Sequence, residues 1–164
     1  EEIHLLCYFP SVDSALNMQS VLNDCYMDIK NREDIFGEQW IMDEEDRPVG
    51  KVDYLLTAAT KLDLYRSVTL VRELGGVPVP AHVDRASYSI ISNLGSIPDD
   101  LCFNTLELSR YTTREDFLNR YPEYSDKYFV TSSDAHKLGM ILERESFIEL
   151  EKLSIADIFE KLKG

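Results

Sequence analysis

The chain has 164 residues, which suits one domain, and 44% of them are hydrophobic and 29% charged, which is a globular composition. No apolar run is long enough for a transmembrane helix, and no charged segment followed by an apolar stretch marks a secretory signal. The net charge of −13 opposes binding to the phosphate backbone of duplex nucleic acid. A small anionic substrate is not excluded, because bound metal cations can reverse the local field. We therefore expect a cytoplasmic protein without membrane contacts.

The cysteines and the start of the chain carry two further expectations. Cys7, Cys25 and Cys102 are odd in number and form no C-x-x-C motif, so we expect reduced thiols that pack as small buried hydrophobes. The chain begins with Glu1-Glu2 and enters an apolar run at once. Because natural N-termini usually have more poorly ordered residues before the first strand, we expect an N-terminally truncated fragment.

The first third of the chain starts regularly and then changes character. Residues 3–9 are nearly all apolar, as in a strand buried on both faces, and Ser11 is a suitable N-cap for a helix that follows. Residues 28–60 contain charged stretches and a turn at residues 47–50. We interpret this part as an insertion or small subdomain.

Strands and helices alternate after residue 60. Asp63 is a suitable N-cap for a helix that Gly75-Gly76 ends, and residues 77–82 predict a strand whose two prolines limit its ladder bonding. Further strands are predicted at residues 104–109, 128–131 and 147–150, with helix-capping pairs at Thr112 with Glu115 and at Ser154 with Asp157. Short connections between these elements favour an α/β class with a mainly parallel sheet in a single domain, residues 1–164.

The three histidines are the residues best placed to carry chemistry. Each of His4, His82 and His136 lies in or just after a predicted strand, and functional sites of α/β folds lie at the carboxyl ends of parallel strands. Asp134 and His136 are two residues apart, so on an extended segment they face the same side. Imidazole with carboxylate suits zinc, iron or manganese.

Two interpretations of these histidines stay open on residue patterns alone. A histidine near a strand is often a hydrogen-bonded structural residue, and a D-x-H pair occurs by chance. Their joint placement favours a metal site instead. Competing chemistry is weak, because there is no G-x-S-x-G motif and Gly75-Gly76 is a helix stop without a following helix N-terminus to hold phosphate.

Three segments resemble a known family. The sequence G-G-V-P-V-P-A-H-V-D-R at residues 75–85, S-S-D-A-H at 132–136 and E-I-H-L-L at 2–6 look like motifs of the PHP (polymerase and histidinol phosphatase) superfamily of metal-dependent phosphoesterases. The likeness is greatest to small bacterial PHP proteins with an insertion after the E-x-H-x-L strand. The insertion there is matched by F-G-E-Q at residues 36–39, and the likeness covers essentially the whole chain.

The resemblance implies a fold and a ligand set. The fold would be part of a distorted seven-stranded (β/α) barrel with mainly parallel strands, plus the small inserted subdomain at about 28–60. His4 and His82 would share one metal with a bridging glutamate, Asp134 would bind the neighbouring metal, and His136 a third. Two or three divalent ions (manganese, zinc, iron or magnesium) would activate a water as nucleophile. Arg85 would contact the substrate phosphate bidentately, whereas its alternative role is a surface salt bridge.

The resemblance also leaves gaps that shape the functional expectation. The family's H-x-H motif, a further histidine or aspartate, a D-H element and the bridging glutamate have no counterpart here, and no histidine is left over. We expect the C-terminal part of a phosphoesterase that is inactive alone, acting on small phosphorylated molecules, nucleotides or oligonucleotide ends, and associating with itself through an open sheet edge. The alternatives are a non-catalytic α/β binding or structural module with a vestigial metal site, and exonuclease support within a polymerase.

Overall fold

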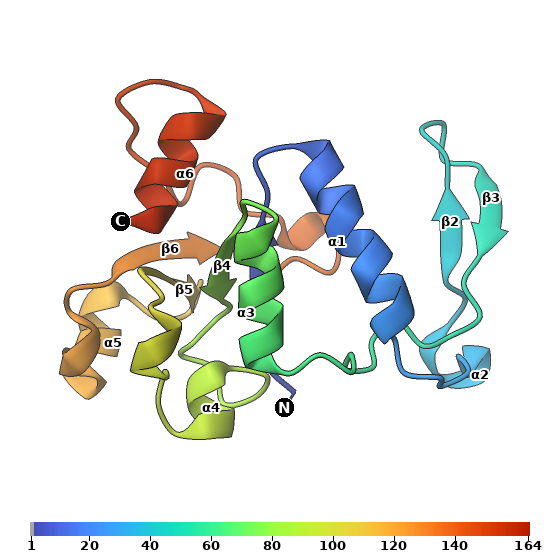
Figure 1. Cartoon of the computed structure of the whole chain (residues 1–164), viewed down its shortest axis with the longest axis horizontal. Coiled ribbons are helices and arrows are strands. Elements are labelled where there is room, and N and C mark those ends of the chain that lie inside the picture. Colours follow the sequence, from blue (N-terminus) through green and yellow to red (C-terminus); the bar gives the residue numbers. More distant parts are fainter. Residues whose placement is uncertain (1) are drawn as a thin grey trace.

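The computed structural model describes residues 2–164 (Figure 1). The chain alternates short strands with helices that differ widely in length. The strands are β1 (Leu5–Tyr8), β2 (Trp40–Met42), β3 (Pro48–Lys51), β4 (Val77–Pro80), β5 (Thr105–Ser109) and β6 (Tyr128–Ser132). The α-helices are α1 (Val12–Cys25), α2 (Glu33–Phe36), α3 (Leu64–Glu73), α4 (Ile90–Leu94), α5 (Arg114–Arg120) and α6 (Ile155–Lys163), and short 3-10 turns are η1 (Asp99–Leu101), η2 (Pro122–Tyr124) and η3 (Leu138–Met140).

The strands form three separate pairs, so the expected seven-stranded, mainly parallel barrel is wrong. β1 pairs antiparallel with β4, β2 with β3 as a hairpin, and β5 runs parallel to β6. Residues 2–164 contain six strands, and their pairs do not close on one another. The α/β class is retained, but only one of the three pairs is parallel.

The prolines of β4 explain why the sheet is interrupted beside this strand. N–H groups of alternate residues point to opposite edges of a strand. Those on the β1 side belong to non-proline residues, as in the bond of 3.1 Å from the Ala81 amide to the carbonyl of His4. On the β5 side the positions are Pro78 and Pro80, which have no N–H to donate. β5 therefore joins β4 only beyond the strand end, where the Val83 amide donates to the Glu107 carbonyl at 2.9 Å.

The caps of the longer helices agree with the sequence patterns, with one shift. Ser11, Asp63 and Ser154 each accept a bond from the backbone amide three residues on, as predicted. α5 is capped by Thr113 with Asp116, one residue later than the predicted pair. The strand predicted at residues 147–150 is wrong, because this segment has no regular secondary structure.

The core consists of three clusters. The largest surrounds Leu106 and Phe117, where α3, α4 and α5 pack against β5. A second joins β4 to α6 through Val79 and Phe159. The third holds α1 against α3 through Met18 and neighbouring apolar side chains. This last contact fixes α1 beside β1, where it forms one wall of the candidate site.

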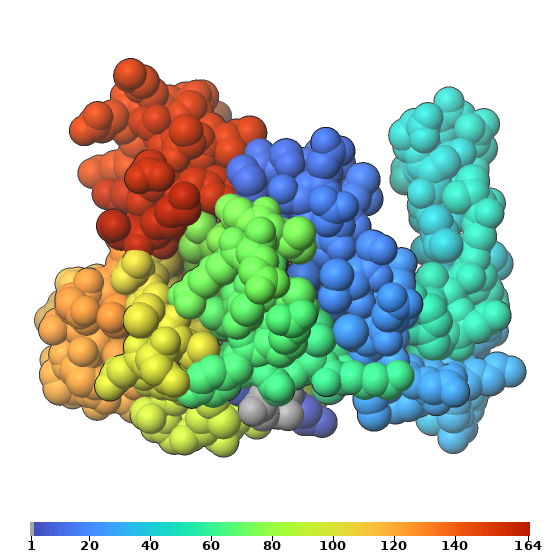
Figure 2. Space-filling model, viewed as in Figure 1, coloured from blue at the N-terminus to red at the C-terminus, as the bar shows by residue number. Residues whose placement is uncertain are grey.

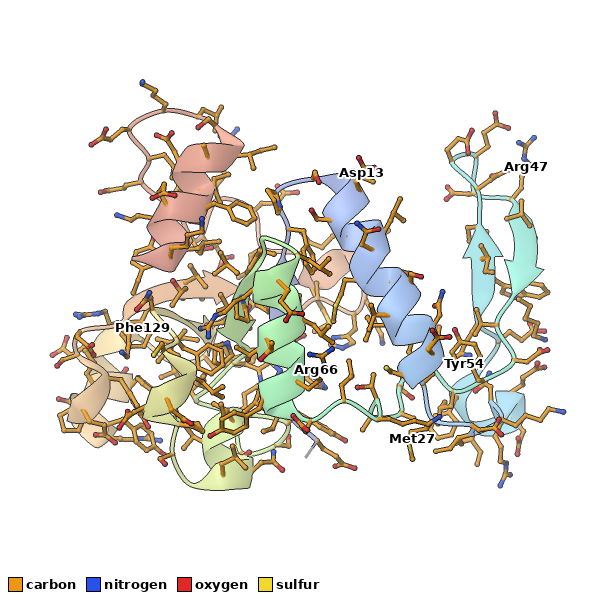
Figure 3. All side chains as sticks on the ribbon, in the orientation of Figure 1. Asp13, Met27, Arg47, Tyr54, Arg66 and Phe129 are labelled. Carbon is orange, nitrogen blue, oxygen red and sulfur yellow. The ribbon has the colours of Figure 1, made fainter. Side chains whose placement is uncertain are left out.

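The segment predicted as an insertion forms α2 and the β2–β3 hairpin. In Figure 2 the hairpin stands apart from the rest of the molecule along most of its length. Figure 3 places Arg47 at its tip and Tyr54 at its base, near the end of α1. The Tyr54 ring contacts Tyr26 with ring centroids 4.8 Å apart. The hairpin is therefore anchored at its base only, away from the histidines.

The cysteines and the helices bear on two further expectations. All three cysteines are free, as expected, but Cys7 and Cys25 are only half-buried and Cys102 is exposed, so the expected burial is wrong for Cys102 and partial for the others. Burial raises the pKa of the Cys7 thiol to about 11, which keeps it protonated and unreactive. Among residues 2–164, no helix combines the length and apolar character needed to cross a bilayer.

Candidate metal and phosphate site

His4 and His82 meet at the junction of β1 and β4. His4 lies just before β1 and His82 just after β4, and the antiparallel pairing places the start of one strand beside the end of the other. His4 Nδ1 and His82 Nε2 are 3.1 Å apart, and the two rings meet edge to face with centroids at 5.2 Å. Tyr88 stacks on His4 at 4.9 Å with an interplanar angle of 14°. The two imidazoles are thus held in fixed orientations by the backbone and a neighbouring ring.

His82 is the buried member of the pair. Its side chain is only 3% exposed, and its Nδ1 is buried without a hydrogen-bond partner among the described residues. Burial, reinforced by the positive charges of His4 and Arg85, lowers the pKa of His82 below its ordinary value. A neutral imidazole is the form that binds metal ions. The unpartnered nitrogen is not the one that faces His4, which is Nε2; leaving Nδ1 without a partner costs about 1–3 kcal/mol, so it marks a separate position where a partner would be favourable.

Glu107 fixes the backbone at His82, and sequence reasoning missed it. Its carboxylate is 4% exposed, accepts the His82 N–H at 2.9 Å, and accepts the Ser132 hydroxyl. His82 has φ of 30°, in the left-handed region, so this bond stabilises an unusual backbone conformation. Burial raises the pKa of Glu107 above its ordinary value. The hydrogen bond from the His82 N–H lowers this pKa, whereas the negative charges of Asp134 and Asp84 raise it further. The available signal was a lone glutamate within an otherwise uncharged β5.

Asp84 ties the loop after β4 to the end of β5. Its carboxylate accepts the Ser109 amide at 2.7 Å and the Ser109 hydroxyl at 2.6 Å. Burial opposes ionisation, but the bonds from Ser109 and Thr112 outweigh it and lower the pKa of Asp84. Asp84 therefore stays ionised as a structural anchor beneath the site.

Asp134 and His136 follow β6 but do not act as the predicted same-side pair. Asp134 has φ of 47°, so the segment is not extended there and the two-residue alternation does not apply. Asp134 lines the same cavity as His4 and His82, whereas His136 is exposed and is not among the lining residues. His136 Nδ1 lies 2.8 Å from the backbone oxygen of Asp134. The structure thus brings together His4, His82 and Asp134, and leaves His136 outside.

Arg85 forms an ion pair with Asp134. Its Nη1 lies 2.6 Å from Asp134 Oδ2, and both side chains are partly exposed, at 45% and 34%. The salt bridge considered for Arg85 is therefore present, at the rim of the site rather than elsewhere on the surface. An arginine at this rim can exchange its carboxylate partner for a phosphate, because the guanidinium binds both in the same bidentate manner.

The donor set fits a metal ion only in part. Two imidazole nitrogens that bind one ion at about 2.0–2.1 Å each lie about 3 Å apart, so the His4–His82 separation suits a shared ion, and it equally suits a direct hydrogen bond between the two rings. Across residues 2–164, however, no three His, Cys, Asp or Glu side chains are grouped closely enough to hold one. The histidine pair supplies two ligands, and Asp134 lies nearby in an ion pair.

A cavity of about 1070 Å³ opens beside these residues. β1 lies along one side of it, and α1 with residues 56–62 forms the other. The space is large enough for a small organic ligand.

No family model, curated protein or solved structure matches this chain. The resemblance to the PHP superfamily therefore stays a prediction.

Proposed function

We propose that this chain carries the metal-binding and phosphate-binding residues of a metal-dependent phosphoesterase of PHP type. The observation that supports it most is the His4–His82 pair, whose facing nitrogens are 3.1 Å apart at the edge of a cavity. Asp134 and Arg85 lie at the same cavity or its rim. Substrates would be small phosphate esters, nucleotides or oligonucleotide ends, and the metal would be manganese, zinc, iron or magnesium.

The chain's own residues have distinct roles in this proposal. His4 and His82 hold the ion, and Glu107 positions His82 through its backbone N–H. Arg85 leaves Asp134 to bind two oxygens of the phosphate, which frees the Asp134 carboxylate as a further ligand. A divalent ion at this place would activate water and polarise a phosphate oxygen.

We also propose that the chain hydrolyses phosphate esters poorly by itself. A two-metal site clamps both the attacking and the leaving oxygen, which needs more donors than two imidazoles and one carboxylate. The remaining ligands would come from residues outside this chain.

A non-catalytic binding or structural module is the second candidate. The observation in its favour is the Arg85–Asp134 ion pair, which occupies the carboxylate that a metal would need. In this case the histidines would be a vestigial site without appreciable metal affinity.

Metal titration separates the two candidates. Free Mn²⁺ is measured by electron paramagnetic resonance during titration of the wild type, His4→Ala and His136→Ala. The phosphoesterase proposal expects one Mn²⁺ per chain, weakened tenfold or more by His4→Ala and unchanged by His136→Ala, whose side chain lies outside the cavity. No binding by the wild type, or equal binding by all three proteins, contradicts it and favours the module.

A further inference from the structure

The cavity has one titratable end and one uncharged wall. The carboxylates and imidazoles that line it lie before β1, after β4, within β5 or after β6, and they are Glu2, His4, His82, Glu107 and Asp134. The opposite wall, from α1 and residues 56–67, contributes only uncharged side chains. Phosphate chemistry is thus confined to one end, and the organic part of a ligand would lie along the other.

The polar groups of the uncharged wall are mostly engaged within the chain. The Ser67 hydroxyl donates to the backbone of Asp63, and the Thr60 hydroxyl accepts the Leu62 amide. The side-chain amide of Gln19 donates to Asn23. What remains for a ligand is largely apolar surface, to which Leu22, Leu56 and Leu62 contribute.

Two residues of the uncharged wall are held in place by the hydrophobic core. Met18 and Leu64 line this wall and are only 5% and 4% exposed, because each packs into a core cluster. At these two positions the wall is held by the core, so a ligand does not have to order them.

No lysine or arginine of the described residues lines the cavity. Arg85 lies at the rim, where it is paired with the lining residue Asp134. One phosphate can be held by Arg85 and a metal ion, but a second phosphate would meet no lysine or arginine on the lining and would face carboxylates such as Glu2 and Asp134.

We infer that the substrate is a phosphate monoester with a single phosphate and an uncharged, largely apolar organic group of aromatic size. The inference rests on the proposed function and narrows it, because it excludes polyanionic oligonucleotides. A volume of about 1070 Å³ lies near the upper end of small-ligand pockets, so a phosphate alone leaves most of it unfilled.

Binding to the full chain at saturating Mn²⁺ tests this inference. Calorimetry compares 2-naphthyl phosphate, glycerol 2-phosphate, a 5′-phosphorylated trithymidylate and 2-naphthol. We expect 2-naphthyl phosphate to bind at least about tenfold more tightly than glycerol 2-phosphate, since it buries an aromatic group against the wall. The trinucleotide should bind no more tightly than glycerol 2-phosphate.

Two neighbouring helix positions give a matched pair of variants. Ala15 and Leu16 are both exposed on α1, but only Ala15 lines the cavity. Ala15→Glu should abolish the advantage of 2-naphthyl phosphate, whereas Leu16→Glu, with the same added charge, should preserve it. Circular dichroism checks that both variants are folded.

The outcomes separate this inference from the proposed function. Equal binding of the two monoesters, or tighter binding of the trinucleotide, overturns the inference. In either of these two cases, the proposed function still stands if Arg85→Ala abolishes the binding of the phosphorylated ligands. Binding of 2-naphthol as tight as that of its phosphate also overturns the inference, because the phosphate end would then contribute nothing. No binding of any phosphate overturns both.

Discussion

Replacing Glu107 tests whether its carboxylate supports the site through hydrogen bonds. Glu107→Ala leaves the His82 N–H buried without an acceptor, which costs about 1–3 kcal/mol of the free energy of unfolding. Ser132 is only half-buried, so its hydroxyl can turn to water and adds little. Glu107→Gln keeps a carbonyl oxygen for the His82 N–H, and its amide can donate to the Ser132 hydroxyl. We expect Glu107→Gln to be close to neutral in acid.

The pH dependence of the difference in stability between Glu107→Gln and the wild type gives the sharper test. Because burial raises the pKa of Glu107 above 4.5, the unfolded chain releases this proton first as the pH rises. Glu107 therefore makes its full contribution to the stability of the fold below about pH 4.5, where it is protonated in both states. This contribution is lost as the pH rises through the pKa of Glu107 in the folded chain. Glutamine does not titrate, so Glu107→Gln should gain stability relative to the wild type between pH 4.5 and 7.5.

Urea unfolding followed by far-ultraviolet circular dichroism at pH 4.5, 6.0 and 7.5 measures this difference. Glu123→Gln is the matched control, because Glu123 is exposed and its replacement should show no such gain. A stability difference between Glu107→Gln and wild type that stays constant with pH refutes the reasoning. So does a wild type that gains on the variant, since the carboxylate would then be stabilised in the fold.

Three other predictions follow from packing, strand edges and the incomplete ligand set. Gly76→Ala places a methyl group 2.7 Å from the Tyr8 carbonyl oxygen, so its melting temperature should fall by several degrees, with Gly139→Ala, which meets nothing within 4 Å, unchanged. The outer edge of β1 pairs with no strand among residues 2–164, so we expect the chain to associate with itself through this edge. Sedimentation over a wide concentration range should then show a species heavier than one chain, and a monomer at all concentrations would contradict this expectation. The purified chain should not turn over a simple phosphomonoester, and robust turnover that His4→Ala abolishes would contradict this.

Local patterns predicted the elements whose causes are themselves local. The caps at Ser11, Asp63 and Ser154 form where a short side chain precedes an amphipathic helix, and no distant contact is needed for that. β4, β5 and β6 lie within the predicted ranges or one residue beyond, since their apolar runs are bounded by turn residues.

The failures concern features that depend on distant partners. The barrel fails because Pro78 and Pro80 remove the donors with which β4 would join β5, a consequence visible only when the neighbour of each edge is known. Residues 147–150 have strand-like composition, but Phe147 is 78% exposed and pairs with no strand. Glu107 escaped notice because its burial depends on the end of β4 and on β6.

The meeting of His4 and His82 was predicted on a premise that the structure replaces. The prediction came from the PHP resemblance, which implies a mainly parallel barrel, and it placed His4 inside the strand at residues 3–9 and His82 at the end of its own strand. In the structure His4 precedes β1, and β1 runs antiparallel to β4. In a parallel pair of these two four-residue strands, His4 before one and His82 two residues beyond the other would be six residue steps apart along the strand axis, or about 20 Å at about 3.3 Å per residue. Antiparallel pairing removes this separation, and the nitrogens lie 3.1 Å apart. The candidate site therefore depends on the direction of β1 relative to β4, and a change that disrupts this pair should abolish metal binding before it unfolds the clusters around β5.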